Sequence, residues 1–371
     1  MNEALANGSA TADFLAGFFT PWLIHAGLTI LHVVLPAREV EGYAQDETTG
    51  ERLHYRLNGL LVLGIAVGLW WLAGWTGWIS WEWLWVHRWS GLVGAISLGL
   101  LLSAAVVFPA PTTGRSLPIE FFLGRRENLQ LFGGRADAKM LLYLVGAVLL
   151  ELNLLSFASH HWLSHPRDPS PGIALYVALF SWFVCEYLFF ERVHLYTYDL
   201  FAERVGFKLV WGCLAWYPYF YPIGLWSTAD LPNPHAPTWL LVLAALLFFS
   251  GWAVARGANM QKYFFKRDRE HVFLGFIEPE TLGSGKRVVL CSGFWGVARH
   301  VNYLGEILMA SGLALSLGWP LLPWPWLYPL YYVVLLGTRE RDDDRRCAGK
   351  YGEVWQAYRK RVPWRIIPGL Y

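Results

Sequence analysis

Long apolar stretches dominate this chain and constrain its fold more than any other feature. A helix that crosses a bilayer needs about 20 mostly apolar residues. Nine stretches approach or reach that length: Phe14–Leu35, Leu57–Trp78, Trp89–Val107, Met140–Phe157, Gly172–Phe190, Leu209–Trp226, Thr238–Val254, Tyr303–Leu317 and Pro320–Gly337. Only 16% of the 371 residues are charged, against about 25% in soluble domains. The sequence predicts an all-α integral membrane protein, a bundle of nine or ten transmembrane helices, with any tenth span near Val288–Val297.

The basic residues between these stretches gather on one side of the predicted bundle. Segments 38–56, 110–139, 191–208, 255–301 and 338–371 hold 28 of the 30 Lys and Arg residues, and the opposite loops hold only Arg88 and Arg167. By the positive-inside rule, the basic side faces the cytoplasm. The C-terminal tail is therefore predicted to be cytoplasmic. The membrane is predicted to be that of the endoplasmic reticulum, or the cytoplasmic membrane in a bacterium.

The chain is predicted to form one polytopic membrane domain over residues 1–371. Residues 1–185 are mainly apolar spans that serve as a scaffold, and the ionisable groups that suit chemistry concentrate in residues 186–371. Ionisable groups close to membrane spans are costly and usually functional. We therefore expect the cofactor and the substrate to bind in the second half.

Two patterns follow the span that ends at Phe190. Glu191, His194 and Asp199 share roughly one helical face, although an ordinary solvated helix end would also carry such charges. The aromatic segment Gly206–Pro222 contains two prolines that break a helix. A broken membrane helix is tolerated where it lines a cavity, and flat rings suit a flat apolar ligand. Plain aromatic packing is the alternative.

Basic and aromatic groups alternate in the last third of the chain. The loop 255–301 has a cluster of basic residues that is suited to binding phosphates. A basic patch that binds lipid headgroups would have the same composition. In the tail, Arg339, Asp343, Arg346 and Lys350 recur every three or four residues, and Tyr351 and Trp355 lie beside them. A solvated helix explains the charges but not the aromatic rings.

Other site classes are not supported. No GxGxxG motif follows a predicted strand, which argues against a Rossmann domain. His160, His161 and His165 form too small a histidine group for a membrane di-iron site, and the four cysteines are widely spaced. We expect neither a metal site nor a nucleic-acid partner, and the oligomeric state is left open.

Short segments in order along the chain carry a family resemblance. They are Tyr55–Gly59, Glu120–Arg125, Asp137–Lys139, Glu191–Asp199, Gly206–Phe207, Trp211–Gly212, Trp216–Tyr221, Ala258–Lys262, Ser292–Gly305 and Arg339–Pro363. Together they resemble the sterol reductase family, which contains the Δ14-sterol reductases, 7-dehydrocholesterol reductase and the membrane part of the lamin B receptor. The resemblance spans nearly the whole chain and is densest from Glu191 onward.

The resemblance implies an NADPH-dependent reductase of a C=C bond in the sterol nucleus, with a sterol drawn from the lipid phase and a cofactor pocket on the cytoplasmic side of the C-terminal half. The family's cofactor site falls on Lys262, Lys266, Trp295, Arg299, His300, Asn302, Tyr303, Arg339, Asp343, Lys350, Tyr351 and Tyr358. Lys262 and Lys266, with Arg267, are predicted to hold the 2′-phosphate. Departures at Cys213, Val301 and Glu306 bear on the substrate, for which C14=C15 is favoured.

Reduction of such a bond requires a proton as well as a hydride. The candidates for the proton donor are Tyr221, Asp199, Glu191 and His194. Two other classes of protein remain as alternatives to a reductase. The Arg299–Gly305 pattern and the tail also resemble isoprenylcysteine carboxyl methyltransferases, which use S-adenosylmethionine but lack the Glu120–Arg125 segment. A sterol-binding scaffold without activity is the third reading.

Overall fold

The computed structural model describes residues 2–46, 50–285 and 287–371. These residues form helices of very different length and, within the described part, three small two-stranded antiparallel sheets. The chain divides into two compact units, residues Met1–Asn233 and Pro234–Tyr371. The predicted division at residues 185/186 separates functions within one membrane domain, and it stays a prediction.

The first unit contains α1 to α12 and β1 to β4. Its longer elements are α1 (Asn2–Val34), β1 (Arg38–Gln45), β2 (Arg52–Leu57), α2 (Gly59–Trp75), α4 (Arg88–Val107), α5 (Leu117–Leu123), α6 (Ala138–Ser164) and α7 (Pro171–Phe189). The short ones are α3 (Trp83–Val86), β3 (Gln130–Leu131), the 3-10 turn η1 (Phe132–Gly134), β4 (Ala136–Asp137), α8 (Glu191–His194), α9 (Tyr198–Phe201), α10 (Phe207–Trp211), the π-helical turn η2 (Gly212–Trp216), α11 (Tyr217–Phe220) and α12 (Ile223–Thr228). The buried helix α6 is the core of this unit.

The helices confirm an all-α integral membrane protein. Among the described residues, five helices are long and apolar enough to cross a bilayer: Ala10–Val34, Arg88–Val107, Ala138–Ser164, Pro171–Phe189 and Thr238–Arg267. The other four predicted stretches are also helical, but they are shorter, interrupted or continued by charged residues.

The predicted broken helix exists and is interrupted in more than one way. Pro218 has no N–H to donate, and a π-helical turn precedes it over Gly212–Trp216. Pro222 then precedes α12. The buried amide of Asn153 on α6 donates to the Pro218 carbonyl oxygen at 2.8 Å. A neighbouring helix thus satisfies a backbone group close to the break.

The Glu120–Arg125 segment contains a buried ion pair that is bonded to the turn before it. Glu120 is 2% exposed, and its carboxylate accepts hydrogen bonds from the Thr112 and Thr113 hydroxyls and the Thr113 N–H. Arg125 Nε lies 2.8 Å from the other carboxylate oxygen, and its Nη1 donates to three carbonyl oxygens of residues 107–110. The hydrogen bond from Thr112 is the main reason that the pKa of Glu120 falls to about 2. This part of the family motif therefore holds a turn together.

The Gly124 and Gly206 backbones touch. Gly124 has a φ of +94°, and a Cβ at Gly206 would lie 2.2 Å from the Gly124 nitrogen. The neighbouring residues Arg126 and Val205 form an antiparallel bridge, with a 2.9 Å hydrogen bond from the Val205 N–H. A side chain at residue 206 would therefore force two backbone segments apart.

Replacing Gly206 with Ala is expected to lower the free energy of unfolding by about 1–3 kcal/mol, the usual cost of overpacking. Gly212→Ala is the matched control, because a Cβ there meets no atom within 4 Å. The measurement is thermal or denaturant unfolding of the two variants in detergent. Equal stability of both variants would show that the Gly124–Gly206 contact yields easily.

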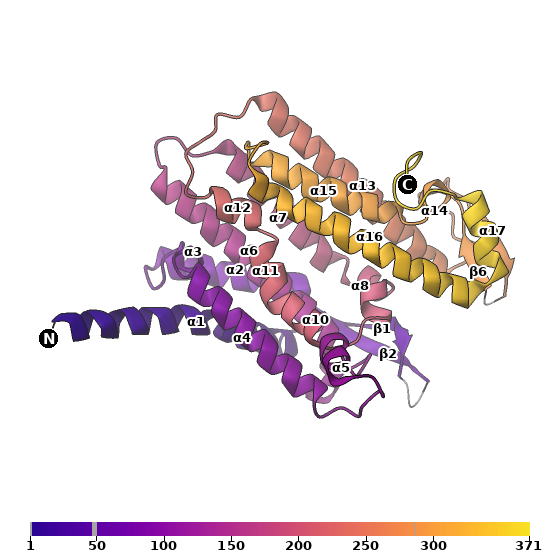
Figure 1. Ribbon diagram of the computed structural model, residues 1–371, viewed down its shortest axis with the longest axis horizontal. Coiled ribbons are helices and arrows are strands. Elements are labelled where there is room, and N and C mark those ends of the chain that lie inside the picture. Colours follow the sequence, from indigo (N-terminus) through magenta and orange to yellow (C-terminus); the bar gives the residue numbers. More distant parts are fainter. Residues whose placement is uncertain (1, 47–49, 286) are drawn as a thin grey trace. The chain divides into compact units, whose positions relative to one another are not determined.

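The second unit consists of α13 (Thr238–Arg267), β5 (Thr281–Ser284), β6 (Arg287–Leu290), α14 (Phe294–Val297), α15 (Val301–Ser316), α16 (Pro323–Tyr351) and α17 (Glu353–Arg361). Helices α13, α15 and α16 lie side by side within it (Figure 1). Gly251 and Gly305 allow the first two to approach closely, since a Cβ on Gly251 would lie 2.5 Å from the Gly305 oxygen. The alternative of a tenth span near Val288–Val297 is wrong. Strand β6 and the four-residue α14 occupy that segment, since its apolar residues pack a small core beside α13.

Candidate functional site

The thirteen predicted cofactor residues all lie in the second unit. Three are at the end of α13 (Lys262, Lys266, Arg267), five in and after α14 (Trp295, Arg299, His300, Asn302, Tyr303), four on the charged half of α16 (Arg339, Asp343, Lys350, Tyr351) and one on α17 (Tyr358). Residues up to 96 positions apart in sequence thus come from one compact unit.

Trp295 is the centre of one group of these residues. Its indole N–H donates to the Ala258 oxygen at 2.9 Å, and its carbonyl accepts from the Tyr358 hydroxyl at 2.7 Å. Lys262 Nζ lies 4.5 Å from the centroid of its ring. Trp295 and Tyr358 are both buried. Lys262, Trp295 and Tyr358 are therefore held in contact by direct interactions.

His300 is the centre of a second group. Its ring stacks on Tyr303 at 5.0 Å, and its Nδ1 lies 3.9 Å from Asp343 Oδ2. Burial lowers the pKa of His300 to about 4, so the imidazole is neutral at pH 7. A neutral imidazole suits a hydrogen bond to an amide or hydroxyl better than a contact with phosphate.

Three buried polar atoms in the segment 299–302 have no hydrogen-bond partner among the described residues. They are Arg299 Nε, His300 Nε2 and Asn302 Oδ1. Buried polar atoms are usually satisfied. Their clustering in one short segment is what a bound polar ligand would explain.

The charges at the end of α13 gather around one carboxylate. Lys266 interacts electrostatically with Lys262 and Lys350, which repel it, and with Asp343, which attracts it. Arg267 is exposed and donates to the Tyr263 hydroxyl at 2.7 Å. Lys262 and Lys350 thus both lie within electrostatic reach of Lys266, and such a group of lysines suits a phosphate.

Sequence reasoning missed Asp344 as a member of this region. Asp344 Oδ1 accepts from the Trp355 indole at 3.0 Å and lies 4.0 Å from Arg299 Nε. Asp342, two residues earlier, is exposed and pairs with Arg345 on the surface. In a run of three aspartates, spacing alone does not tell which ones face the protein.

In the first unit, Glu191 is buried at the start of α8. Its Oε2 accepts a hydrogen bond from the Gly59 N–H at 3.1 Å, and burial raises its pKa to about 7. A Cβ on Gly59 would lie 2.4 Å from Glu191 Oε1. The two segments of the resemblance that hold Gly59 and Glu191 therefore meet in the fold.

The other proton-donor candidates surround Tyr187 and Tyr217. The His194 ring lies 4.1 Å from the Tyr187 ring, and the Tyr221 ring packs edge to face on Tyr217 at 4.6 Å. Tyr187 interacts electrostatically with Tyr217, Asp199 and Glu191. The structure thus brings all four candidates into one neighbourhood of the first unit. Tyr187 was missed because it lies inside an apolar span.

Glu151 was also missed. It lies on the buried helix α6, is 5% exposed and accepts from the Ser181 hydroxyl at 2.6 Å. Its position inside a predicted span was the available signal, because carboxyl groups in membrane helices are rare and mark functional sites.

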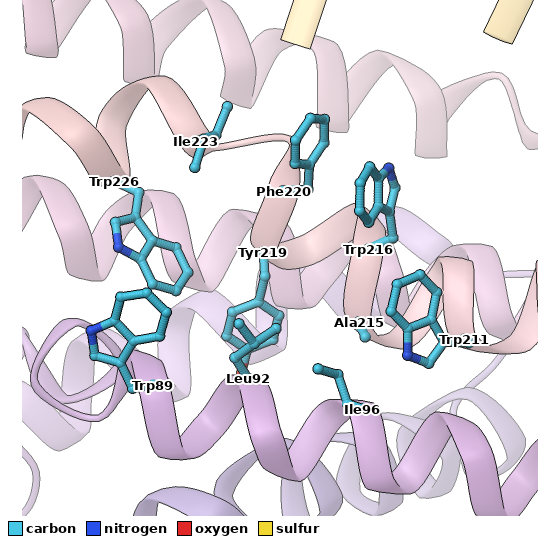
Figure 2. Close-up of a pocket in the computed structure, with 10 residues that line it drawn as sticks. All are labelled: Trp89, Leu92, Ile96, Trp211, Ala215, Trp216, Tyr219, Phe220, Ile223 and Trp226. Atoms are coloured by element: carbon cyan, nitrogen blue, oxygen red, sulfur yellow. The ribbon is translucent and has the colours of Figure 1, made fainter. Parts of the chain in front are cut away.

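An aromatic pocket lies within the first unit. It has a volume of about 280 Å³ and is lined by Trp89, Leu92, Ile96, Trp211, Ala215, Trp216, Tyr219, Phe220, Ile223 and Trp226. Figure 2 shows Trp89 and Trp226 at one end and Trp211 and Trp216 at the other, with Tyr219 between them. Helix α4 forms one wall and the broken helix forms the other (Figure 2). The predicted aromatic segment thus lines a cavity without charged groups, and Tyr221 is not among its lining residues.

Comparison with known proteins places these features in a family context. The ergosterol biosynthesis ERG4/ERG24 family matches residues 9–371. A Delta(14)-sterol reductase of Methylotuvimicrobium alcaliphilum is 31% identical over 96% of this chain and 83% of its own length. A Delta(14)-sterol reductase of Arabidopsis thaliana is 31% identical over 93% of each chain. The Delta(14)-sterol reductase TM7SF2 of Mus musculus is 33% identical over 96% of this chain and 87% of its own length.

Proposed function

Because the chain belongs to the ergosterol biosynthesis ERG4/ERG24 family, we propose that it is a sterol reductase that uses NADPH to reduce the C14=C15 bond of a sterol nucleus. The observation that carries the proposal is the match to relatives named Delta(14)-sterol reductase over 93–96% of the chain. The membrane fold supports a substrate that arrives through the lipid phase.

The second unit suits a phosphorylated dinucleotide. Lys262, Lys266 and Lys350 offer ammonium groups for phosphates, and Trp295 offers a flat ring. The unpartnered atoms in segment 299–302 can bond to amide and hydroxyl groups of the cofactor. We propose that the loops and the C-terminal tail that carry most of the basic residues face the cytoplasm, as the positive-inside rule predicts.

When bound, NADPH supplies a hydride. An alkene carbon does not accept hydride readily until the neighbouring carbon has been protonated, so the protein must provide an acid. Glu191 is the leading candidate, since its pKa of about 7 keeps much of it protonated at neutral pH. His194, Asp199 and Tyr221 are the alternatives. Exclusion of water by the apolar surroundings would protect a carbocation on the sterol.

The proposal is tested by unfolding the detergent-solubilised protein with NADPH, NADH or S-adenosylmethionine. A ligand at 100 times its Kd stabilises the folded state by about 2.7 kcal/mol. We expect NADPH to raise Tm most, NADH less and S-adenosylmethionine not at all. Stabilisation by S-adenosylmethionine alone would favour the methyltransferase reading instead.

The position of the double bond is tested separately, by sterol profiling of a host that lacks Δ14 reduction and expresses this chain. Loss of the accumulated Δ14-sterols is expected. Unchanged sterols in the presence of folded, NADPH-binding protein would support a scaffold or a reductase of another bond.

A further inference from the structure

The chain after α17 folds back into a closed turn, residues 365–371. The Tyr371 backbone oxygen accepts hydrogen bonds from the N–H groups of Arg365, Ile366 and Ile367 at 2.8, 2.9 and 3.0 Å. The Tyr371 N–H in turn donates to the Ile367 oxygen at 2.9 Å. Three amides that converge on one oxygen hold this turn rigidly.

This turn and the residues before it are bonded to the predicted cofactor segment. The Arg299 N–H donates to the Trp364 oxygen at 3.0 Å, and the His300 N–H donates to the Arg365 oxygen at 2.8 Å. The Arg299 guanidinium donates from Nη1 to the Val362 and Pro363 oxygens at 2.9 and 3.0 Å. Arg299 Nη1 is therefore engaged by the two residues that precede Trp364, whereas its Nε has no hydrogen-bond partner among the described residues.

A buried carboxylate ties the turn to α16. Glu340 has no exposed surface, and its Oε2 lies 3.1 Å from Arg365 Nη1 and 3.4 Å from the Tyr371 hydroxyl. The Arg365 guanidinium also lies 5.6 Å from the centroid of the Tyr371 ring. A buried carboxylate is tolerated only when it is paired, and removal of a partner is costly. Glu340, Arg365 and Tyr371 thus form one interdependent group, here called the tail clasp.

The tail clasp and His300 meet the same helix one turn apart. Asp343, three residues after Glu340 on α16, lies 3.9 Å from His300 Nδ1. The backbone of His300 is fixed through Arg365, and Arg365 is fixed through Glu340. A shift of the turn would therefore move His300 relative to Asp343.

We propose that Glu340, Arg365 and Tyr371 are positioning residues that set the orientation of Arg299 and His300 for cofactor binding. The inference rests on the proposed function, because it assumes that segment 299–303 binds NADPH. None of the three clasp residues need touch the cofactor. Their effect passes through backbone hydrogen bonds to Arg299 and His300.

Glu340→Gln is the main test, with Asp342→Asn as the matched control. Both remove one negative charge from α16, but Asp342 is exposed and pairs only with Arg345 at the surface among the contacts described. We expect Glu340→Gln to raise the KM for NADPH about tenfold, which corresponds to about 1.4 kcal/mol, with kcat and the KM for sterol within twofold of wild type. Asp342→Asn should change none of these values.

Tyr371→Phe keeps the ring and the backbone and removes one hydroxyl, so it serves if Glu340→Gln does not fold. A smaller rise in the KM for NADPH, about threefold, is expected. The two hydrogen bonds that the hydroxyl makes, to Glu340 Oε2 at 3.4 Å and from Arg365 Nη1 at 3.5 Å, are both long. A clasp that only stabilises the fold would lower Tm and the active fraction without changing the KM for NADPH. That result in either folded variant overturns the proposal.

Measurements on the wild-type protein distinguish a failure of the proposed function from a failure of the tail clasp inference. If it neither binds NADPH nor reduces a sterol, the proposed function fails and the positioning role fails with it. If wild type is active and either folded variant retains its KM for NADPH, only the tail clasp inference fails.

Discussion

Glu191→Gln is expected to abolish sterol reduction while NADPH binding persists. The amide has the shape of the carboxyl group and can still accept the hydrogen bond from the Gly59 N–H, which the structure gives as 3.1 Å. It cannot deliver a proton to an alkene carbon. A loss of about 10²–10⁴-fold in kcat is typical when a general acid is removed. Single-turnover reduction and NADPH titration of the variant measure the two properties separately.

The Glu191 carboxyl group leads to two predictions, one about the pH dependence of kcat and one about the pH dependence of folding stability. If Glu191 is the proton donor, kcat falls as pH rises through about 7, where the group loses its proton. Burial raises its pKa from 4.5, so the folded state holds this proton more tightly than the unfolded state. Its contribution to stability is therefore greatest below pH 4.5, falls as pH rises to about 7, and amounts to about 3 kcal/mol.

A glutamine does not ionise, so Glu191→Gln should not lose folding stability as pH rises. The variant should therefore be more stable than wild type at pH 8, although it is inactive. Glu127→Gln is the control, because Glu127 is 40% exposed and pairs with Arg204 at 3.2 Å. A Glu191 variant with normal turnover and the wild-type pH profile would exclude Glu191 as the donor. Asp199→Asn, His194→Gln and Tyr221→Phe would then be compared, and normal turnover in all four variants would end this placement of the acid.

The apolar pattern was sufficient to predict the membrane fold, because helices that satisfy their own backbone are the natural structure for long apolar stretches. Pro218 and Pro222 likewise predicted the broken helix, since their effect on the backbone is local. The apolar run at Val288–Val297 was less informative. A short apolar strand and a short buried helix have the same composition, and only the surrounding core distinguishes them from a span.

The candidate site could be predicted in outline but not in its contacts. Spacing predicted that Asp343 shares a helical face with Arg339, Arg346 and Lys350, yet it did not separate Asp344 from Asp342. The segment Glu120–Arg125 carried the resemblance as strongly as the cofactor residues, but its buried ion pair closes a turn. Arg299 is engaged with backbone carbonyls 63 and 64 residues away. Such pairings depend on which distant segments meet, and one sequence does not contain that information.

Lys266→Ala is expected to weaken NADPH binding about 10- to 100-fold and to leave NADH binding within about twofold. The reason is that a hydrogen bond to a charged group contributes about 1.5–3 kcal/mol, and the 2′-phosphate is the only group that distinguishes the two cofactors. Lys266 lies within electrostatic reach of Lys262 and Lys350, so its removal lowers the positive potential that favours a phosphate. The Kd values for NADPH and NADH, measured at two salt concentrations, test this.

Arg269→Ala is the control for this cluster, because Arg269 is exposed and its guanidinium lies 4.9 Å from the Phe265 ring centroid. It should change neither Kd by more than about twofold, as expected for an exposed charge screened by salt. Arg267→Ala should have an intermediate effect, since Arg267 is tied to the Tyr263 hydroxyl. Equal weakening of NADPH and NADH by Lys266→Ala would move Lys266 from the 2′-phosphate to the pyrophosphate. If Lys266→Ala weakens the binding of neither cofactor, the end of α13 does not belong to the cofactor site, because loss of a lysine that contacts a phosphate would raise the Kd.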